Sequence, residues 1–190
     1  LATGQIAQYT MEQLKDVSFL VRNFYFVDGE TSVTDSLFDG EKLVSMDMTM
    51  KQENDAPQIL IYHTHSQEAY ADSRPGNEED TVVDIGSYLA KILEEDYGYN
   101  IIHDKTYYDV IGGKHGYNLS YSEAEKGLKK MLEKYPTIEV MIDLHRNSGN
   151  AKTVVIDGEE TAQIMLFNGL CRDQNGPLTN YDNPYLQDIP

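Results

Sequence analysis

The fold is decided by the stretch Ile59-Leu60-Ile61-Tyr62-His63-Thr64-His65-Ser66-Gln67-Glu68. Its first four residues form a short apolar run with β-branched members, which predicts a buried strand. Side chains that can ligate a metal follow directly. A second stretch, Ile138 to Leu144, has the same character of a buried strand and is followed by His145-Arg146-Asn147. Both predicted strands therefore end in histidine.

Helical patterns lie between these strands. The first helix is expected from a cap at Asp80 or Thr81 to a stop at Gly98, and a strand at residues 100–102 follows it. The second helix is expected from a capping box at Ser122 and Glu125 to a point before Pro136. Two more strands are expected at residues 153–156 and 162–167, joined as a hairpin through Asp157-Gly158.

Strands that alternate with helices of this length predict an α/β fold, with a mainly parallel central sheet and helices on both faces, in three layers. The N-terminal residues 1–56 read as a separate segment. Thr10 and Gln13 resemble the capping box of an amphipathic helix, and the alternating Met46, Met48 and Met50 indicate an edge strand. We therefore expect an N-terminal helix and edge segment at 1–56 and a catalytic domain at 57–190.

The charge of the chain excludes one class of function. Acidic residues outnumber basic ones 32 to 15, which gives a net charge of -17. A chain this acidic is not drawn to phosphate backbones or to anionic lipid, so nucleic-acid binding is not expected. No apolar run is long enough to span a bilayer, and any membrane attachment is expected through an anchor absent from this chain.

Histidines gather where ligands of a parallel sheet are expected, at the carboxyl ends of its strands. His65 and Glu68 are three positions apart, so one tight turn can direct both side chains at a single point. His145 from the second strand end would complete a His₂Glu set, with a fourth position left for water, as in catalytic zinc sites. Zinc would make amide hydrolysis feasible without a covalent intermediate.

The ligand set has alternatives. His63 is two positions from His65, so it can replace His65 as a ligand or act as a hydrogen-bonding partner behind the ligands, a role also open to Asp143. Arg146 can steady an oxyanion or a substrate carboxylate, or form a structural ion pair. Other chemistries fit worse, because the sequence has no Gly-x-Ser-x-Gly elbow and no phosphate-binding glycine-rich loop after a strand.

Three stretches of the sequence carry a family resemblance. The strings Tyr62-His-Thr-His-Ser-Gln-Glu-Ala-Tyr70, Gly116-Tyr-Asn-Leu-Ser-Tyr-Ser-Glu123 and Ile142-Asp-Leu-His-Arg-Asn147 resemble the stage II sporulation protein P family, membrane-anchored cell-wall hydrolases of endospore-forming bacteria. Val82-Val83-Asp84-Ile85-Gly86 belongs to the same pattern. The resemblance covers about residues 57–170.

The resemblance implies a fold similar to zinc N-acetylmuramoyl-L-alanine amidases and zinc carboxypeptidases, with Zn²⁺ on His65, Glu68 and His145. It implies hydrolysis of the amide between muramic acid and L-alanine in peptidoglycan, and of stem-peptide cross-links, during engulfment. It further implies sporulation proteins D and M as partners, and an extracytoplasmic place at the membrane, on the mother-cell side of the sporulation septum.

The sequence departs from the family pattern in two places. Thr81 stands where family members usually have an asparagine. Family members also continue into a last helix and strand with a general-base glutamate, which is expected beyond Pro190, so the catalytic domain is expected to be truncated. Two other functions stay open: a non-catalytic peptidoglycan-binding scaffold of the same machinery, and a zinc carboxypeptidase-like peptidase for which Arg146 would bind a terminal carboxylate.

Overall fold

The computed structural model describes residues 9–31, 33, 37–149 and 152–178 of the 190-residue chain. Contacts divide the chain into two compact units, one of residues 49–151 and one of residues 1–48 together with 152–190. The predicted domain division between residues 56 and 57 stays a prediction, because compact units are groups of contacts and not independently folding domains. The expectations for the end of the chain, at residues 179–190, lie outside the described residues.

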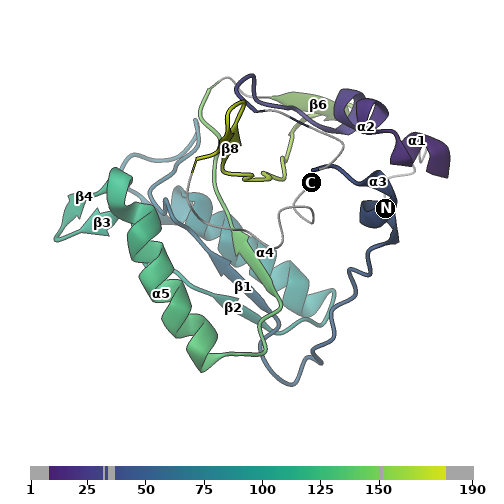
Figure 1. Cartoon of the computed structure of the whole chain (residues 1–190). Helices are drawn as coiled ribbons and strands as arrows, with labels where there is room; N and C mark the ends of the chain where they lie inside the picture. Colours follow the sequence, from purple (N-terminus) through teal and green to yellow (C-terminus); the bar gives the residue numbers. More distant parts are fainter. Residues whose placement is uncertain (1–8, 32, 34–36, 150–151, 179–190) are drawn as a thin grey trace. The chain divides into compact units, whose positions relative to one another are not determined.

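The 49–151 unit is built on a three-stranded parallel sheet with the order β2–β1–β5 (Figure 1). β1 (Ile59–Tyr62) lies in the centre, between β2 (Ile101–His103) and β5 (Val140–Asp143). Each crossover contains one long helix, α4 (Val82–Glu95) before β2 and α5 (Ser120–Lys134) before β5. The predictions of a mixed α/β fold and a parallel sheet are confirmed.

The two long helices cover opposite faces of this sheet (Figure 1). Ile59 and Ile61 of β1 point toward α4 and form a buried cluster with Ala90. Partly buried apolar residues surround this cluster: Met50, Leu89, Leu93, Tyr99, Ile101, Val140, Ile142 and Leu144. Because successive strand residues point to opposite faces, Tyr62 and Asp143 face α5 instead.

The start of α4 was predicted correctly and the start of α5 was not. Thr81 caps α4, and its hydroxyl accepts a hydrogen bond from the Val83 N–H at 3.3 Å. α5 begins at Ser120, because the 3₁₀ turn η2 (Tyr117–Leu119) runs directly into it. The predicted capping box at Ser122 is therefore wrong, and the Ser122 hydroxyl donates back to the Leu119 carbonyl at 2.8 Å.

Short elements complete this unit. The 3₁₀ turn η1 (Glu78–Asp80) precedes α4, and β3 (Val110–Ile111) forms a small antiparallel hairpin with β4 (Lys114–His115). Gly112 and Gly113 at the hairpin turn have φ values of +59° and +76°, which a residue with a Cβ rarely adopts. The turn is therefore favoured by this pair of glycines.

The other unit contains short helices in its N-terminal part: α1 (Met11–Lys15), α2 (Val17–Phe24) and α3 (Gly40–Ser45). The capping box of Thr10 and Gln13 is confirmed. The predicted edge strand at Met46 to Met50 is wrong, since no strand covers these residues and Met48 is 81% exposed. Alternation alone does not make a strand where no neighbouring strand pairs with the backbone.

The C-terminal part of that unit forms two antiparallel hairpins, β6 (Thr153–Ile156) with β7 (Glu159–Ala162), and β8 (Arg172–Asp173) with β9 (Gly176–Pro177). The predicted turn at Asp157-Gly158 is confirmed, with φ values of +53° and +87°. The predicted strand at 162–167 is wrong. A two-residue turn places Glu159 opposite Ile156 at once, so the returning strand begins and ends earlier.

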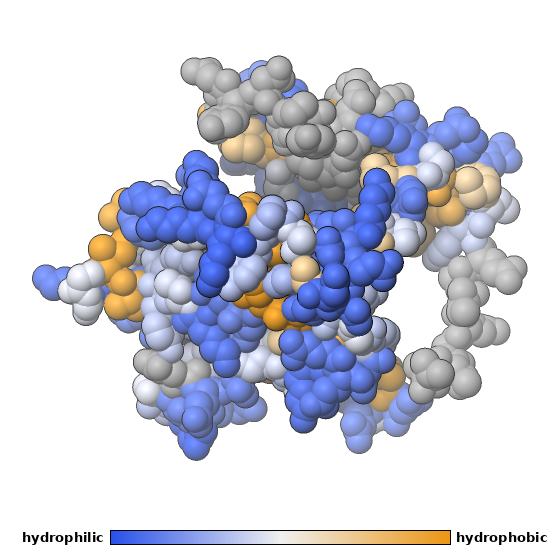
Figure 2. All heavy atoms as spheres, turned by 90° about the horizontal axis from the view of Figure 1, so that it is seen from below, coloured by the Kyte–Doolittle hydropathy of each residue, from blue (hydrophilic) through white to orange (hydrophobic). Residues whose placement is uncertain are grey.

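The face in Figure 2 is mostly hydrophilic, with hydrophobic residues gathered in small separate patches. This agrees with the chain's excess of acidic side chains. Among the described residues, no helix has the length and apolar character needed to cross a bilayer.

Candidate functional site

The carboxyl ends of β1 and β5 lie side by side and carry the polar residues singled out in the sequence. Tyr62 stands level with Asp143, and the Leu144 N–H donates to the Tyr62 carbonyl at 3.0 Å. The residues that follow β1, His63 to Ser66, are each at most 2% exposed. A buried row of polar side chains is unusual in a protein core and indicates a functional site.

His65, Glu68 and His145 come together at this edge. The ring centroids of His65 and His145 are 5.3 Å apart. The Nδ1 of His145 is 3.5 Å from a carboxylate oxygen of Glu68, and the same oxygen accepts the backbone N–H of Arg146 at 2.5 Å. The predicted set is therefore assembled from two separate stretches, one after each strand.

Asp143 lies behind this group and holds His145. Its carboxylate is 2.9 Å from Nε2 of His145, and it accepts two hydrogen bonds from Thr64, from the backbone N–H at 2.9 Å and from the hydroxyl at 2.5 Å. Asp143 thus fixes which nitrogen of His145 faces Glu68, while its role behind metal ligands stays a prediction.

Hydrogen bonds within the group shift the pKa values of its members. Hydrogen bonds to Asp143 and then to Glu68 raise the pKa of His145 to about 9. Burial acts to raise the pKa of Glu68, but hydrogen bonds to His145 and to the Arg146 N–H outweigh it and lower that pKa. The pKa of Asp143 is lowered in the same way against burial, by His145 and Thr64. The two carboxylates and the positively charged form of His145 therefore stabilise one another.

His65 is buried without a hydrogen-bonding partner. Neither Nδ1 nor Nε2 has a partner among the described residues. The ring of Tyr117 stacks on it with centroids 4.0 Å apart and planes 6° apart, and Tyr121 meets it edge-on at 5.3 Å. A buried imidazole with both nitrogens unpaired is costly, unless a group outside the chain uses them.

His63 is directed away from this group. Its Nδ1 lies 3.0 Å from the Leu144 carbonyl, and its Nε2 lies 2.8 Å from Nε2 of His103. Burial lowers the pKa of both histidines. The pKa of His103 falls to about 4, and the nearby His63 is the second cause of that shift. Gly86 of α4 packs on the pair, since a Cβ there would lie 2.7 Å from His63 and 2.8 Å from His103.

Arg146 contributes its backbone and leaves its side chain exposed. The N–H holds Glu68, while the guanidinium donates to the Asn147 carbonyl at 3.3 Å. In the described part of the chain it forms no ion pair, so the structural ion pair considered for it is not seen there.

Some residues that build the site were not found from the sequence. Asp109 is buried and accepts the Ser66 hydroxyl at 2.6 Å and the Gln67 N–H at 3.1 Å, which fixes the turn between His65 and Glu68. Tyr117, stacked on His65, enters the sequence analysis only through the family resemblance. No local pattern in the sequence signals a pairing across some 40 residues of chain, and the burial of Asp109 is visible only in the folded structure.

The described residues contain no group of three or more His, Cys, Asp or Glu side chains already arranged around one metal position. In the structure both nitrogens of His145 face carboxylates instead. The donors that could hold a metal are nevertheless neighbours, and His65 is free to take part.

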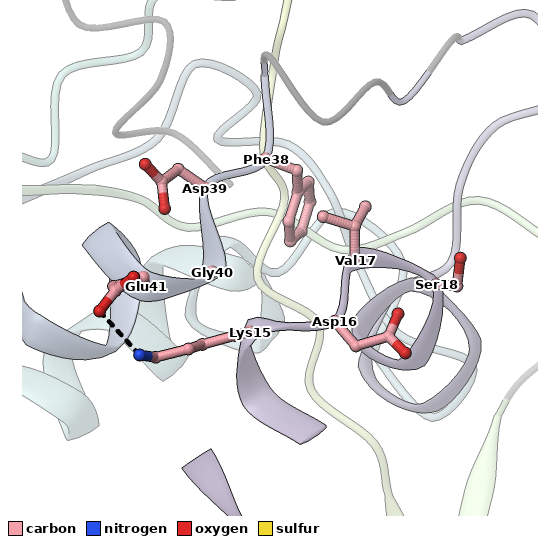
Figure 3. A pocket seen from close by; sticks show the side chains of 8 residues that line it. All are labelled: Lys15, Asp16, Val17, Ser18, Phe38, Asp39, Gly40 and Glu41. Atoms are coloured by element: carbon pink, nitrogen blue, oxygen red, sulfur yellow. Dashed lines mark hydrogen bonds and ion pairs between the residues drawn. The ribbon is translucent and has the colours of Figure 1, made fainter. Parts of the chain in front are cut away.

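A separate cavity of about 440 Å³ lies in the other unit, between the ends of its short helices (Figure 3). Its charged side chains are used by the fold. Lys15 pairs with Glu41 at 2.7 Å, and the carboxylates of Asp16 and Asp39 cap α2 and α3. This cavity therefore does not compete with the strand-end group as a functional site.

Comparison with known proteins identifies the family. The family model described as Stage II sporulation protein P (SpoIIP) matches residues 7–184, so the chain belongs to this family. No curated protein and no solved structure matches the chain. Family membership gives the chain a role in sporulation.

Proposed function

We propose that this member of the Stage II sporulation protein P family is a zinc-dependent peptidoglycan hydrolase. Its substrate bond is the amide between N-acetylmuramic acid and L-alanine, with stem-peptide cross-links as a second target. His65, Glu68 and His145 hold the metal. The observation that carries the proposal is their convergence at the carboxyl ends of two neighbouring parallel strands.

The spacing of the donors supports zinc. Two ligand atoms at bond lengths of about 2.0–2.1 Å and a tetrahedral angle lie about 3.3 Å apart, and two imidazole centroids on one zinc lie about 5 Å apart. His145 Nδ1 and Glu68 are 3.5 Å apart, and the His65 and His145 rings 5.3 Å. The unpaired nitrogens of His65 supply the remaining donor. We assign the ligand to His65 and not to His63, whose two nitrogens are already used.

The chain's own residues prepare this site for hydrolysis. Zinc, when bound, polarises the scissile carbonyl and acidifies a water molecule. Asp143 occupies Nε2 of His145 and leaves Nδ1 for the metal, while the Arg146 N–H orients Glu68. We assign to the exposed Arg146 guanidinium the binding of a developing oxyanion or a substrate carboxylate.

The proposal extends to the fold and the setting. One helix on each face of a parallel sheet supports the three-layer architecture of zinc amidases and carboxypeptidases. The family resemblance suggests sporulation proteins D and M as partners, and an extracytoplasmic location at the engulfing membrane.

Metal content tests the ligand assignment. Purified protein, dialysed against buffer without zinc, should retain about one zinc per chain by elemental analysis. His65→Ala and His145→Ala should each lose it, because a three-residue site that keeps two ligands binds far more weakly. His115→Ala, an exposed histidine on β4, is the matched control and should retain it. Equal zinc in wild type and His145→Ala would overturn the assignment.

Peptide release from purified sacculi, with added zinc, tests the activity. Release by wild type and none by His145→Ala supports hydrolysis. Binding to sacculi without release would instead support the non-catalytic scaffold.

A further inference from the structure

A row of hydrogen bonds crosses the carboxyl edge of the three-stranded sheet. His103 ends β2, His63 follows β1 and Leu144 follows β5, so each strand supplies one member of this strand-end network. Nε2 of His103 lies 2.8 Å from Nε2 of His63, and Nδ1 of His63 lies 3.0 Å from the Leu144 carbonyl oxygen. His63 is fully buried, and Gly86 of α4 packs against both rings. The network ends one residue before His145, a proposed zinc ligand.

The chemistry of the two contacts gives the network a direction. A carbonyl oxygen can only accept, so Nδ1 of His63 carries the proton of the bond to Leu144. A positive charge on the pair would be buried without a hydrogen-bonded carboxylate among the described residues, which is costly, so both rings are neutral. A neutral imidazole has one N–H, and Nε2 of His63 is therefore an acceptor. It follows that Nε2 of His103 carries a proton and donates it.

The network holds the backbone from which His145 extends. The Leu144 N–H donates to the Tyr62 carbonyl at 3.0 Å, and the Leu144 carbonyl accepts from His63. That carbonyl and the N–H of His145 belong to one planar peptide unit, so the bond from His63 orients this unit as a whole. Nδ1 of His145 lies 3.5 Å from Glu68, and a rotation of the peptide before His145 would change this spacing.

We infer that His103 is a positioning residue for the proposed zinc site. It forms no hydrogen bond to the three proposed ligands in the described structure, and it acts through His63. Its Nε2–H holds the His63 ring with the proton on Nδ1, and this ring holds the peptide that carries His145. Without that donor, His63 loses one of the two bonds that orient its ring and fix its tautomer. The effect on zinc binding rests on the proposed function, whereas the network itself does not.

Nitrogen-15 nuclear magnetic resonance of the histidine rings, on the metal-free full chain, tests the network directly. A ring nitrogen that carries a proton differs in chemical shift from one with a lone pair, so the spectrum reports each tautomer. We expect the proton on Nδ1 in His63 and on Nε2 in His103. A His63 with its proton on Nε2, or with protons on both nitrogens near neutral pH, would overturn the inference without the need for any variant.

Two substitutions of His103 test its effect on the metal. His103→Leu removes the donor and should weaken zinc binding about 10–100-fold, the loss typical of residues that orient metal ligands from behind. His103→Gln keeps a side-chain N–H donor and should recover most of the affinity. Competition with a chelator measures the zinc dissociation constants. Equal affinity in wild type and His103→Leu, or no recovery in His103→Gln, would overturn the positioning role.

Tyr108→Phe is the matched control for a general loss of stability. It removes a buried hydrogen bond of the same unit, from the Tyr108 hydroxyl to Asp104 at 2.6 Å, but no member of the network. This variant should lose stability in urea and keep the wild-type zinc affinity and the wild-type tautomer of His63. A loss of zinc affinity as large as that of His103→Leu would mean that His103 acts through stability alone.

Failure of this inference and failure of the proposed function give different results. If the wild-type protein binds zinc and cleaves sacculi, and His103→Leu binds zinc equally well, the hydrolase stands and the positioning role falls. If the wild-type protein binds no zinc, the hydrolase is rejected. The ring signals of His145 in metal-free protein then decide the positioning role, because they should move in His103→Leu and stay in place in Tyr108→Phe.

Discussion

Two apolar runs of equal length differ in this protein, because one is buried in a strand and the other is exposed. Ile59 to Tyr62 forms the central strand, where Leu60 and Ile61 are fully buried. Ile164 to Phe167, in the other unit, forms no strand, and Ile164 and Leu166 are 93% and 88% exposed. The first run has a parallel strand on each side, and the second pairs with none among the described residues. Burial thus follows from pairing partners, and not from the apolar character of a run alone.

Truncation of one leucine in each run should give the largest difference in stability between the two runs. Leu60→Ala removes a fully buried side chain beneath the site and should lower the free energy of unfolding by about 2–5 kcal/mol. Leu166→Ala removes an exposed side chain and should change it by less than about 0.5 kcal/mol. Urea denaturation measures both. Similar losses in the two variants would mean that the second run is buried as well.

Two glycine-to-alanine variants test how closely α4 packs on His63 and His103. Gly86→Ala would place a Cβ against the rings of His63 and His103, which already contact each other, and should cost about 1–3 kcal/mol of unfolding free energy. Gly29→Ala, in the other unit, meets nothing within 4 Å and should leave stability almost unchanged. Thermal unfolding compares them; a Gly86→Ala protein as stable as Gly29→Ala would refute the close packing of α4 on the histidine pair.

The smallest expected effect is a pH dependence that arises in the 49–151 unit. Burial, and then His63, lower the pKa of His103 from 6.5 to about 4, so the unfolded chain binds a proton more readily between these values. The stability contributed by neutral His103 is therefore complete above pH about 6.5 and lost as the pH falls toward about 4. His145, with its pKa raised to about 9, titrates above this window.

His103→Gln keeps an amide donor for His63 but does not titrate, so its stability should fall less than that of wild type between pH about 7 and about 5. Urea midpoints at both pH values, in metal-free buffer, provide the measurement. Equal declines would show that His103 is not the group responsible.

The strand-end group could be predicted because its signal is local. Parallel strands bring their carboxyl ends to one edge, so two strand patterns ending in histidine suffice to place His65 near His145. The turn at Asp157-Gly158 and the caps at Thr10 and Thr81 were predicted correctly for the same reason, since each is encoded within a few residues.

What the sequence did not reveal depends on register and on loops. His103 meets His63 because it pairs with Ile61 across the sheet, and Tyr117 covers His65 because the η2 turn places it there. The strands predicted at Met46 to Met50 and at 162–167 failed where alternation or apolar character had no partner strand. Pairing between distant segments is the information that a single sequence does not display.

The central claim is that His65, Glu68 and His145 surround one divalent ion. Anomalous scattering at the zinc edge, from crystals grown with zinc, tests it most directly. The account predicts one peak within about 2.0–2.2 Å of a nitrogen of His65, a nitrogen of His145 and an oxygen of Glu68. A peak between His63 and His103, or no peak at the ends of β1 and β5, would contradict it.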